Sequence, residues 1–178
     1  MPPRYLKMNQ DQLRGLVGRI YDAFCNASLS RKYYSHRLTN YRIINRWYEI
    51  VLGVGSSATV AAWSLWKVPG GANFWTAFAG AIAVLALIKP FLPLSNDIER
   101  FSKLHTGYTD LYYDLQVLIE DLKTNSGVTK DIADRAENAE KRYKELALQD
   151  DPKVRKRLHR KCEEEVRKAF PTSYFWKP

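Results

Sequence analysis

The side chains that could do acid–base chemistry are few and lie far apart in the sequence. His36, His105 and His159 fall in three separate helical segments. Histidine is the side chain best suited to proton transfer near neutral pH, but an isolated histidine is more often a packing or surface residue. The consecutive glutamates 163–165 point in different directions on a helix and do not converge on one site. We therefore predict no catalytic residue.

The sequence also lacks the motifs of the common enzyme classes. It contains no nucleophile elbow, glycine-rich phosphate loop or His-Glu zinc motif. Cys25 and Cys162 are far apart, and no metal-ligand spacing surrounds either of them. Such cysteines are typical of ordinary thiols in a reducing compartment. We predict that the protein is not an enzyme and binds neither a metal nor a cofactor.

The remaining functional candidates are small or hydroxyl-bearing residues in an apolar part of the chain. Small residues let helices approach closely, and hydroxyl groups can face a water path. Two helices cannot enclose such a path, so a pore requires several chains around an axis. The alternative is simple helix packing, with the hydroxyls bonded to their own backbone. The candidates for span packing or pore lining are Gly53, Ser56, Ser57, Thr59, Ala61 and Gly80.

Two uncharged apolar stretches position these candidates. Ile50–Trp66 has 17 residues and Val68–Ile88 has 21, whereas a bilayer core needs about 20 helical residues. Starting the first span at Trp47 adds an aromatic ring suited to the headgroup region. A Pro-Gly-Gly turn joins the stretches. The sequence thus predicts a transmembrane hairpin with spans of about 47–66 and 72–89 and an outer turn at 67–71. The alternative is a buried hairpin in a soluble domain.

The charge distribution predicts the orientation of this hairpin. Lys and Arg number 9 before Glu49 and 18 from Lys89 onward, whereas the connecting loop holds only Lys67. The positive-inside rule therefore places both termini in the cytoplasm and the protein in the inner (plasma) membrane as a multi-pass protein. The net charge of +9 is largely what this topology demands, so no nucleic-acid binding is predicted.

Residues 1–46 are predicted to be cytoplasmic helices. Asn9 has the character of a helix N-cap, with Gln12 at the capping-box position. The segment 26–30 could interrupt the helix that follows, and from Arg31 the helical pattern continues into the first span. The apolar residues that recur at helical spacing on its first face are Leu13, Leu16, Val17, Ile20 and Phe24.

Residues 91–178 are predicted to form a cytoplasmic helical bundle or coiled-coil region. Thr129 is expected to cap a helix that returns antiparallel to the preceding one. Asp151 is expected to cap the last helix, which runs to about Phe170. A heptad-like seam indicates either intramolecular packing or oligomerisation, and its residues are Leu104, Tyr108, Leu111, Leu115, Leu118 and Leu122.

Basic side chains near these elements are candidates for contact with anionic lipid or an acidic partner. A solvated charged face is the alternative for each of them. Two lie before the first span and five lie at the start of the last helix. They are Arg42, Arg46, Lys153, Arg155, Lys156, Arg157 and Arg160.

The order of these elements resembles the SLATT family, the small two-transmembrane effectors associated with SMODS nucleotidyltransferases and SLOG sensors in prokaryotic conflict systems. The resemblance covers most of the chain. It rests on the tyrosine-rich basic helix 33–46, "WYEI" at 47–50, the Gly/Ser/Ala first span, the Pro-Gly-Gly turn, "IKP" at 88–90 and "DIERFSKL" at 97–104. It implies a pore-forming or membrane-disrupting effector, released by a partner sensor or nucleotide signal, and it brings no catalytic residue.

Together these observations predict an all-α integral membrane protein, a two-transmembrane hairpin with long cytoplasmic helices. Its expected function is that of a membrane effector of an anti-phage conflict system, which oligomerises into a pore and causes cell death or arrest. The alternative is a non-conducting, membrane-anchored scaffold that recruits a cytoplasmic partner through the helical seam. The expected partners are the lipid bilayer, further copies of the chain, and a sensor protein or nucleotide-signal synthase encoded nearby.

Overall fold

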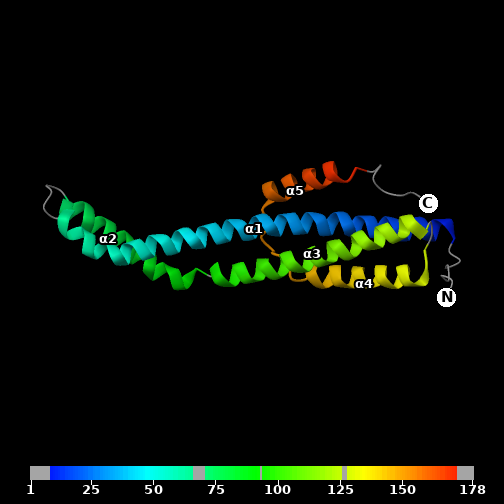
Figure 1. Cartoon of the computed structure of the whole chain (residues 1–178), viewed down its shortest axis with the longest axis horizontal. Coiled ribbons are helices and arrows are strands. Elements are labelled where there is room, and N and C mark those ends of the chain that lie inside the picture. Colours follow the sequence, from blue (N-terminus) through cyan, green and yellow to red (C-terminus); the bar gives the residue numbers. More distant parts are fainter. Residues whose placement is uncertain (1–8, 66–70, 93, 126–127, 172–178) are drawn as a thin grey trace. The chain divides into compact units, whose positions relative to one another are not determined.

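The computed structural model describes residues 9–65, 71–92, 94–125 and 128–171, and the elements in these ranges are helices (Figure 1). The elements are α1 (Gln10–Leu65), α2 (Gly71–Ile88), the short 3-10 helix η1 (Lys89–Phe91), α3 (Leu94–Asn125), α4 (Lys130–Ala147) and α5 (Lys156–Ala169). The predicted all-α class is confirmed.

The predicted transmembrane hairpin is wrong. Within the described ranges, no helix combines the length and the apolar character needed to cross a membrane. The second apolar stretch yields α2, whose bounds nearly coincide with those of the predicted span 72–89. The first stretch is the end of α1, a helix of 56 residues that is largely polar before Ile50 and whose described part stops at Leu65. The inner-membrane location and the pore were inferred from this hairpin, so they are corrected with it. The lipid bilayer as a partner is not tested and stays a prediction.

The chain divides into two compact units. Unit 1 comprises the described residues of Met1–His36 and Phe101–Pro178, and unit 2 comprises those of Arg37–Arg100. Helix α1 contributes residues to both units, and unit 1 is assembled from two separate parts of the sequence. The sequence-based division placed its boundaries at 46/47 and 90/91.

The first part of α1 has the predicted N-terminal capping contact and the predicted buried face. The backbone N–H of Asn9 donates to Oε1 of Gln12 at 3.2 Å, which is the expected capping-box contact. Val17, Ile20 and Phe24 are buried, as their helical spacing predicts. The possible interruption at 26–30 does not occur, because α1 continues through this segment with Ala27 buried in the core.

Helices α3 and α4 form the predicted antiparallel pair. Arg135 of α4 contacts Asp121 of α3 at 2.6 Å, and Arg142 of α4 contacts Asp114 of α3. The partner on α3 moves back seven residues as the position on α4 moves forward seven, which is the register of antiparallel helices. Thr129 caps α4 by accepting from the backbone N–H of Ile132 at 3.3 Å, so the predicted cap is confirmed.

Helix α5 begins later than the predicted cap at Asp151. Its first residue is Lys156, and Oδ1 of Asp151 instead accepts from the backbone N–H of Lys153 at 2.9 Å. The phenol oxygen of Tyr33 accepts from the backbone N–H of Arg155 at 3.0 Å. This bond comes from α1, so a tertiary contact holds the segment before α5 and delays the start of the helix.

Helix α5 packs antiparallel to the first part of α1. Phe24 contacts Phe170 with ring centroids 4.9 Å apart, and Nζ of Lys32 lies 3.0 Å from Oε2 of Glu165. Later residues of α1 thus meet earlier residues of α5. The core of unit 1 lies between α1, α3, α4 and α5, and Cys162 is fully buried in it.

Unit 2 contains the second part of α1 together with α2, η1 and the first residues of α3. The phenol of Tyr48 donates to the backbone carbonyl of Leu85, so α1 and α2 lie side by side there. Helix α2 ends at Ile88, where Lys89 and Pro90 begin the 3-10 turn. Proline lacks the N–H that a continuing α-helix would need, which explains this end.

A close approach of α4 to α3 occurs at Gly107. A Cβ atom at this position would lie 2.6 Å from Cδ2 of Leu146, whereas a Cβ at the exposed Gly15 of α1 would meet no atom within 4 Å. Gly15→Ala is therefore expected to raise the free energy of unfolding by about 0.5–1 kcal/mol through helix propensity alone. Gly107→Ala should gain less than this or lose stability, because Leu146 has to move. Urea unfolding of both variants checks the difference, and equal gains would contradict the close approach.

Candidate functional site

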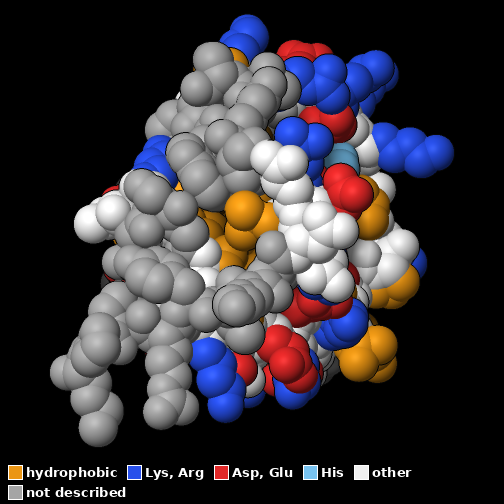
Figure 2. Space-filling model, turned by 90° about the vertical axis from the view of Figure 1, so that its right-hand side faces the viewer, with side chains coloured by type: hydrophobic (Ala, Val, Ile, Leu, Met, Phe, Trp, Pro, Cys, Tyr) orange, Lys and Arg blue, Asp and Glu red, His pale blue; other side chains and the backbone are white. Residues whose placement is uncertain are grey.

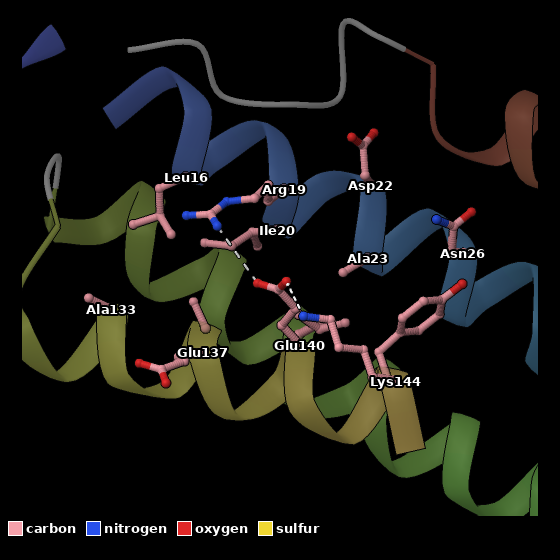
Figure 3. A pocket seen from close by; sticks show the side chains of 13 residues that line it. Leu16, Arg19, Ile20, Asp22, Ala23, Asn26, Ala133, Glu137, Glu140 and Lys144 are labelled. Carbon is pink, nitrogen blue, oxygen red and sulfur yellow. Dashed lines mark ion pairs between the residues drawn. The ribbon is translucent and has the colours of Figure 1, made fainter. Parts of the chain in front are cut away.

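A groove runs along unit 1 between α1 and α4. Its cavity volume is about 660 Å³. Leu16, Ile20 and Ala23 of α1 lie across the groove from Ala133 of α4 (Figure 3), and Ala136 of α4 also lines it. Leu115 of α3 also lines the groove. Because alanine side chains are short, the two helices leave this space open between them. The groove can accommodate apolar groups of moderate size.

Charged side chains border this groove in pairs. Figure 3 shows Arg19 of α1 and Lys144 of α4 reaching toward Glu140, at 3.8 and 2.9 Å. The hydrogen bond from Lys144 lowers the pKa of Glu140, and the hydrogen bond from Lys141 lowers the pKa of Glu137. Both carboxyl groups are therefore held ionised. A paired, ionised carboxylate is a poor general acid.

Opposite charges are also mixed on the face of the molecule seen in Figure 2. Lys and Arg side chains alternate with Asp and Glu side chains over its coloured surface. Nucleic-acid binding surfaces usually gather Lys and Arg on one face or along one helix. The described side chains on this face are not arranged in that way.

Two buried tyrosines of the unit 1 core meet at the carboxylate of Asp150. The phenols of Tyr34 and Tyr108 both donate to Oδ1 of Asp150, each at 2.9 Å. Their rings stack with centroids 5.8 Å apart and planes within 6° of parallel. The backbone N–H of Asp151 donates to the phenol oxygen of Tyr34 at 3.1 Å. We call Tyr34, Tyr108 and Asp150 the tyrosine clasp, because they tie the α4–α5 connection to α1 and α3.

The tyrosine clasp stabilises the fold through hydrogen bonds. Burial raises the pKa of Tyr34 and of Tyr108 well above the usual tyrosine value, and the nearby Asp150 charge raises both further. The phenols therefore stay protonated and act as hydrogen-bond donors. Burial likewise raises the pKa of Cys25 and Cys162, neither of which is in a disulfide. Both remain thiols, as expected of ordinary half-buried or buried cysteines.

The seam residues lie in the interior of unit 1. All six are at most 1 % exposed, so their packing is intramolecular. A partner could reach them only if the bundle opened, and recruitment through the seam is therefore not supported by the folded chain. The buried seam residues are Leu104, Tyr108, Leu111, Leu115, Leu118 and Leu122.

The predicted span residues lie in unit 2. Gly53 and Gly80 have open space where a Cβ would be placed. The side chains of Ser56, Ser57, Thr59 and Ala61 lie outside the described part of the structure, so their proposed packing or pore-lining role is not addressed by it.

The predicted basic contacts are exposed and are divided between the two units. Arg42 and Arg46 belong to unit 2, whereas the other five belong to unit 1 around the start of α5. Arg155 supplies the N-cap of α5. The exposed side chains are those of Arg42, Arg46, Lys153, Arg155, Lys156, Arg157 and Arg160.

Unit 2 exposes an apolar stripe that the sequence reading assigned to a membrane span and its approach. Eleven of the fifteen exposed large hydrophobic residues in the described part of the chain belong to this unit. Trp47 is 63 % exposed. Spacings of three and four residues place these side chains on one face of α1. We call Ile43, Ile44, Trp47, Ile50 and Val51 the α1 stripe.

A second set of apolar side chains is exposed on α2 and η1. Leu87 is 71 % exposed and Phe91 is 82 % exposed, and Val84 and Ile88 accompany them at helical spacing. The signal for both sets was present in the sequence as repeats of three and four residues. The residues from Trp47 to Ile88 were assigned to the predicted spans, whereas Ile43 and Ile44 fell in the predicted cytoplasmic helices 1–46.

The structure brings together two of the three histidines. His36 and His105 line one pocket, which also contains Glu165, although they lie in different helices. His159 lies elsewhere, with its ring centroid 6.1 Å from that of Tyr33. In the described part of the chain, no three His, Cys, Asp or Glu residues are placed to hold a metal ion.

The comparisons with known proteins add no relative. The motifs behind the SLATT resemblance lie mainly in unit 2 and at its two ends. The roles in antiviral defence and abortive infection that the resemblance implied gain no support from the comparisons. No family model matches the chain, and neither the curated proteins nor the solved structures include a match.

Proposed function

We propose that the protein is a non-catalytic helical scaffold that recruits an amphipathic helix with an acidic edge onto unit 2. The observation that carries this proposal is the exposed α1 stripe. A contiguous exposed apolar face is typical of an interaction site. Its spacing fits a helix laid along it, since anchors three and four residues apart are how helices are bound in apolar grooves.

The surroundings of the stripe indicate the chemistry of the partner. Arg46 follows Ile43 by three residues and precedes Ile50 by four, so its side chain borders the stripe. Arg42 precedes Arg46 by one turn and extends the same edge. The opposite edge is the side of Tyr48, which bonds to α2. A helix lying on the stripe therefore meets arginines along one edge.

Charge favours a distinct acidic partner over a second copy of the chain. The whole chain carries a net charge of +9, so two copies repel at long range, whereas an acidic helix is attracted. The resemblance to SLATT proteins supports a responding component that works with a separate sensor, and the acidic helix would then belong to that sensor protein.

A designed peptide pair tests this proposal. The probe is a helical peptide with leucines at i, i+3, i+4 and i+7 and glutamates along one edge, and its control carries lysines there instead. Fluorescence anisotropy of labelled peptides should show about tenfold or tighter binding of the glutamate peptide. Trp47→Ala should weaken its binding, and the double variant R42E/R46E should reverse the preference. Arg14→Glu, an exposed change in unit 1, serves as the matched control.

Two outcomes would contradict the proposal. Equal binding of the two peptides would remove the arginine edge from recognition. A stable dimer in analytical ultracentrifugation that Trp47→Ala dissociates would show that a second copy covers the stripe instead.

A further inference from the structure

A small pocket in unit 1 gathers cationic and imidazole side chains from α1, α3 and α5. Its cavity volume is about 320 Å³, near the lower end of known ligand pockets. Its lining is polar throughout. The side chains are those of Arg31, Lys32, Ser35, His36, His105 and Glu165.

The pocket is independent of the α1 stripe and of the groove. All of its lining residues belong to unit 1, and none of them lines the groove between α1 and α4. The inference drawn from it therefore does not depend on the proposed recruitment of a helix.

Two of its side chains are held in place by neighbouring groups. The guanidinium carbon of Arg31 lies 3.9 Å from the ring centroid of Tyr112, so this cation is stacked on an aromatic face. Nδ1 of His105 lies 3.2 Å from the backbone carbonyl oxygen of Arg31, so that nitrogen is the donor. The Nε2 atom of His105 is left as the nitrogen that can gain a proton.

The charge balance of the pocket favours an anion. Arg31 and Lys32 are the basic side chains of the pocket, and Glu165 is the carboxylate that opposes them. Nζ of Lys32 lies 3.0 Å from Oε2 of Glu165, and this hydrogen bond lowers the pKa of Glu165. Lys161 of α5 also acts on Glu165 and adds positive charge beside the pocket. Protonation of His36 and His105 would add two further charges.

We propose that this pocket binds a small phosphate monoester, and that it binds more tightly as the two histidines become protonated. A tetrahedral dianion with three terminal oxygens can accept from the guanidinium of Arg31, from Ser35 and from the imidazoles. Lys32 has two alternative partners, Glu165 in the unliganded pocket and the anion in the bound state. Glu165 thus competes with the ligand for the same ammonium group.

This competition gives a test in which two variants break the same ion pair and change binding in opposite directions. Lys32→Gln removes a donor and should weaken binding about tenfold or more. Glu165→Gln removes the competitor and a repulsive charge, so it should tighten binding several-fold. Isothermal titration of the full chain with glycerol 3-phosphate measures both. Methyl acetate, a neutral ester, is the negative control and should not bind.

The pH dependence is measured with sulfate, because it stays a dianion where a phosphate monoester titrates. Binding of sulfate should be several-fold tighter at pH 5.5 than at pH 8, because histidine is the side chain that most readily gains a proton as the pH falls below neutral. The double variant H36Q/H105Q should bind sulfate equally at both pH values, and Lys32 should still contribute to its binding.

Each remaining outcome overturns the inference. If neither glycerol 3-phosphate nor sulfate binds at millimolar concentration, the pocket is not an anion site. If Lys32→Gln and Glu165→Gln change binding in the same direction, the ion pair stabilises the fold and Lys32 does not bind the anion. If the wild type and H36Q/H105Q show the same pH profile, the histidines take no part.

Discussion

Asp150→Ala is expected to lower the free energy of unfolding by about 3 kcal/mol, because a buried hydroxyl left without its partner costs about 1–3 kcal/mol. Two phenols would lose their acceptor at once, since Tyr34 and Tyr108 both donate to Oδ1 of Asp150 at 2.9 Å. Both tyrosines are buried, so water does not readily replace the carboxylate. Urea unfolding followed by circular dichroism measures the change.

Two control variants show whether the loss of stability comes from removing the hydrogen-bond acceptor at Asp150 or merely from removing a negative charge. Asp150→Asn keeps one acceptor oxygen and should cost about 1 kcal/mol. Asp134→Ala, an exposed change on α4, should cost less than about 0.5 kcal/mol. A loss below 1 kcal/mol for Asp150→Ala would mean that the clasp is not the anchor of the α4–α5 connection.

Stability should also fall steeply at alkaline pH because of the same two tyrosines. In the folded chain the pKa values of Tyr34 and Tyr108 are raised by burial, whereas the unfolded chain has the ordinary value of about 10. Below pH 10 both phenols are protonated in the folded and in the unfolded chain, so their contribution to the free energy of unfolding is fully present. Above pH 10 the unfolded chain releases its protons first. Each tyrosine then lowers the free energy of unfolding by about 1.4 kcal/mol per pH unit, or about 2.7 kcal/mol for the pair.

Urea unfolding between pH 8 and pH 11.5 measures this slope. Tyr108→Phe cannot ionise at that position, so its slope should be smaller than that of the wild type by about 1.4 kcal/mol per pH unit. Tyr113→Phe, at a residue that is 56 % exposed, is the matched control and should keep the wild-type slope. Identical slopes for Tyr108→Phe and the wild type would show that the buried phenol is not linked to unfolding.

The parts of the fold that the sequence predicted are those that local chemistry determines. The cap at Thr129 needs only its own hydroxyl and the N–H three residues on. The burial of Leu111 and Leu118 follows from spacings of three and four within α3. By contrast, the start of α5 depends on Tyr33, which is 122 residues away from Arg155 in the sequence. The residues near Arg155 in the sequence give no indication of this hydrogen bond.

The membrane prediction rested on two uncharged apolar stretches. The helix in the second stretch, Gly71–Ile88, nearly coincides with the predicted span 72–89, so the position of the helix was predicted, but its membrane environment is not supported. Apolar composition alone does not distinguish a lipid-facing helix from a helix whose exposed apolar face is covered by another helix.

The candidate sites were less predictable than the fold. His36, His105 and Glu165 are distant in sequence, and their meeting depends on the register of three helices. The groove depends on the short side chains of Ala133 and Ala136, whose helical spacing marks a core face but not an opening. Only the basic edge at Arg42 and Arg46 was identified beforehand.

The assembly of unit 1 from two separate parts of the chain bears on the order in which it folds. The contacts between α3 and α4 join residues as close as 14 positions apart, whereas Lys32 and Glu165 are 133 positions apart. Closing the longer loop costs about 2 kcal/mol more in chain entropy. The α3–α4 hairpin can therefore form early, with its acidic and arginine side chains already paired. Docking of α1 and α5 onto that hairpin would then be the slow step that completes the core.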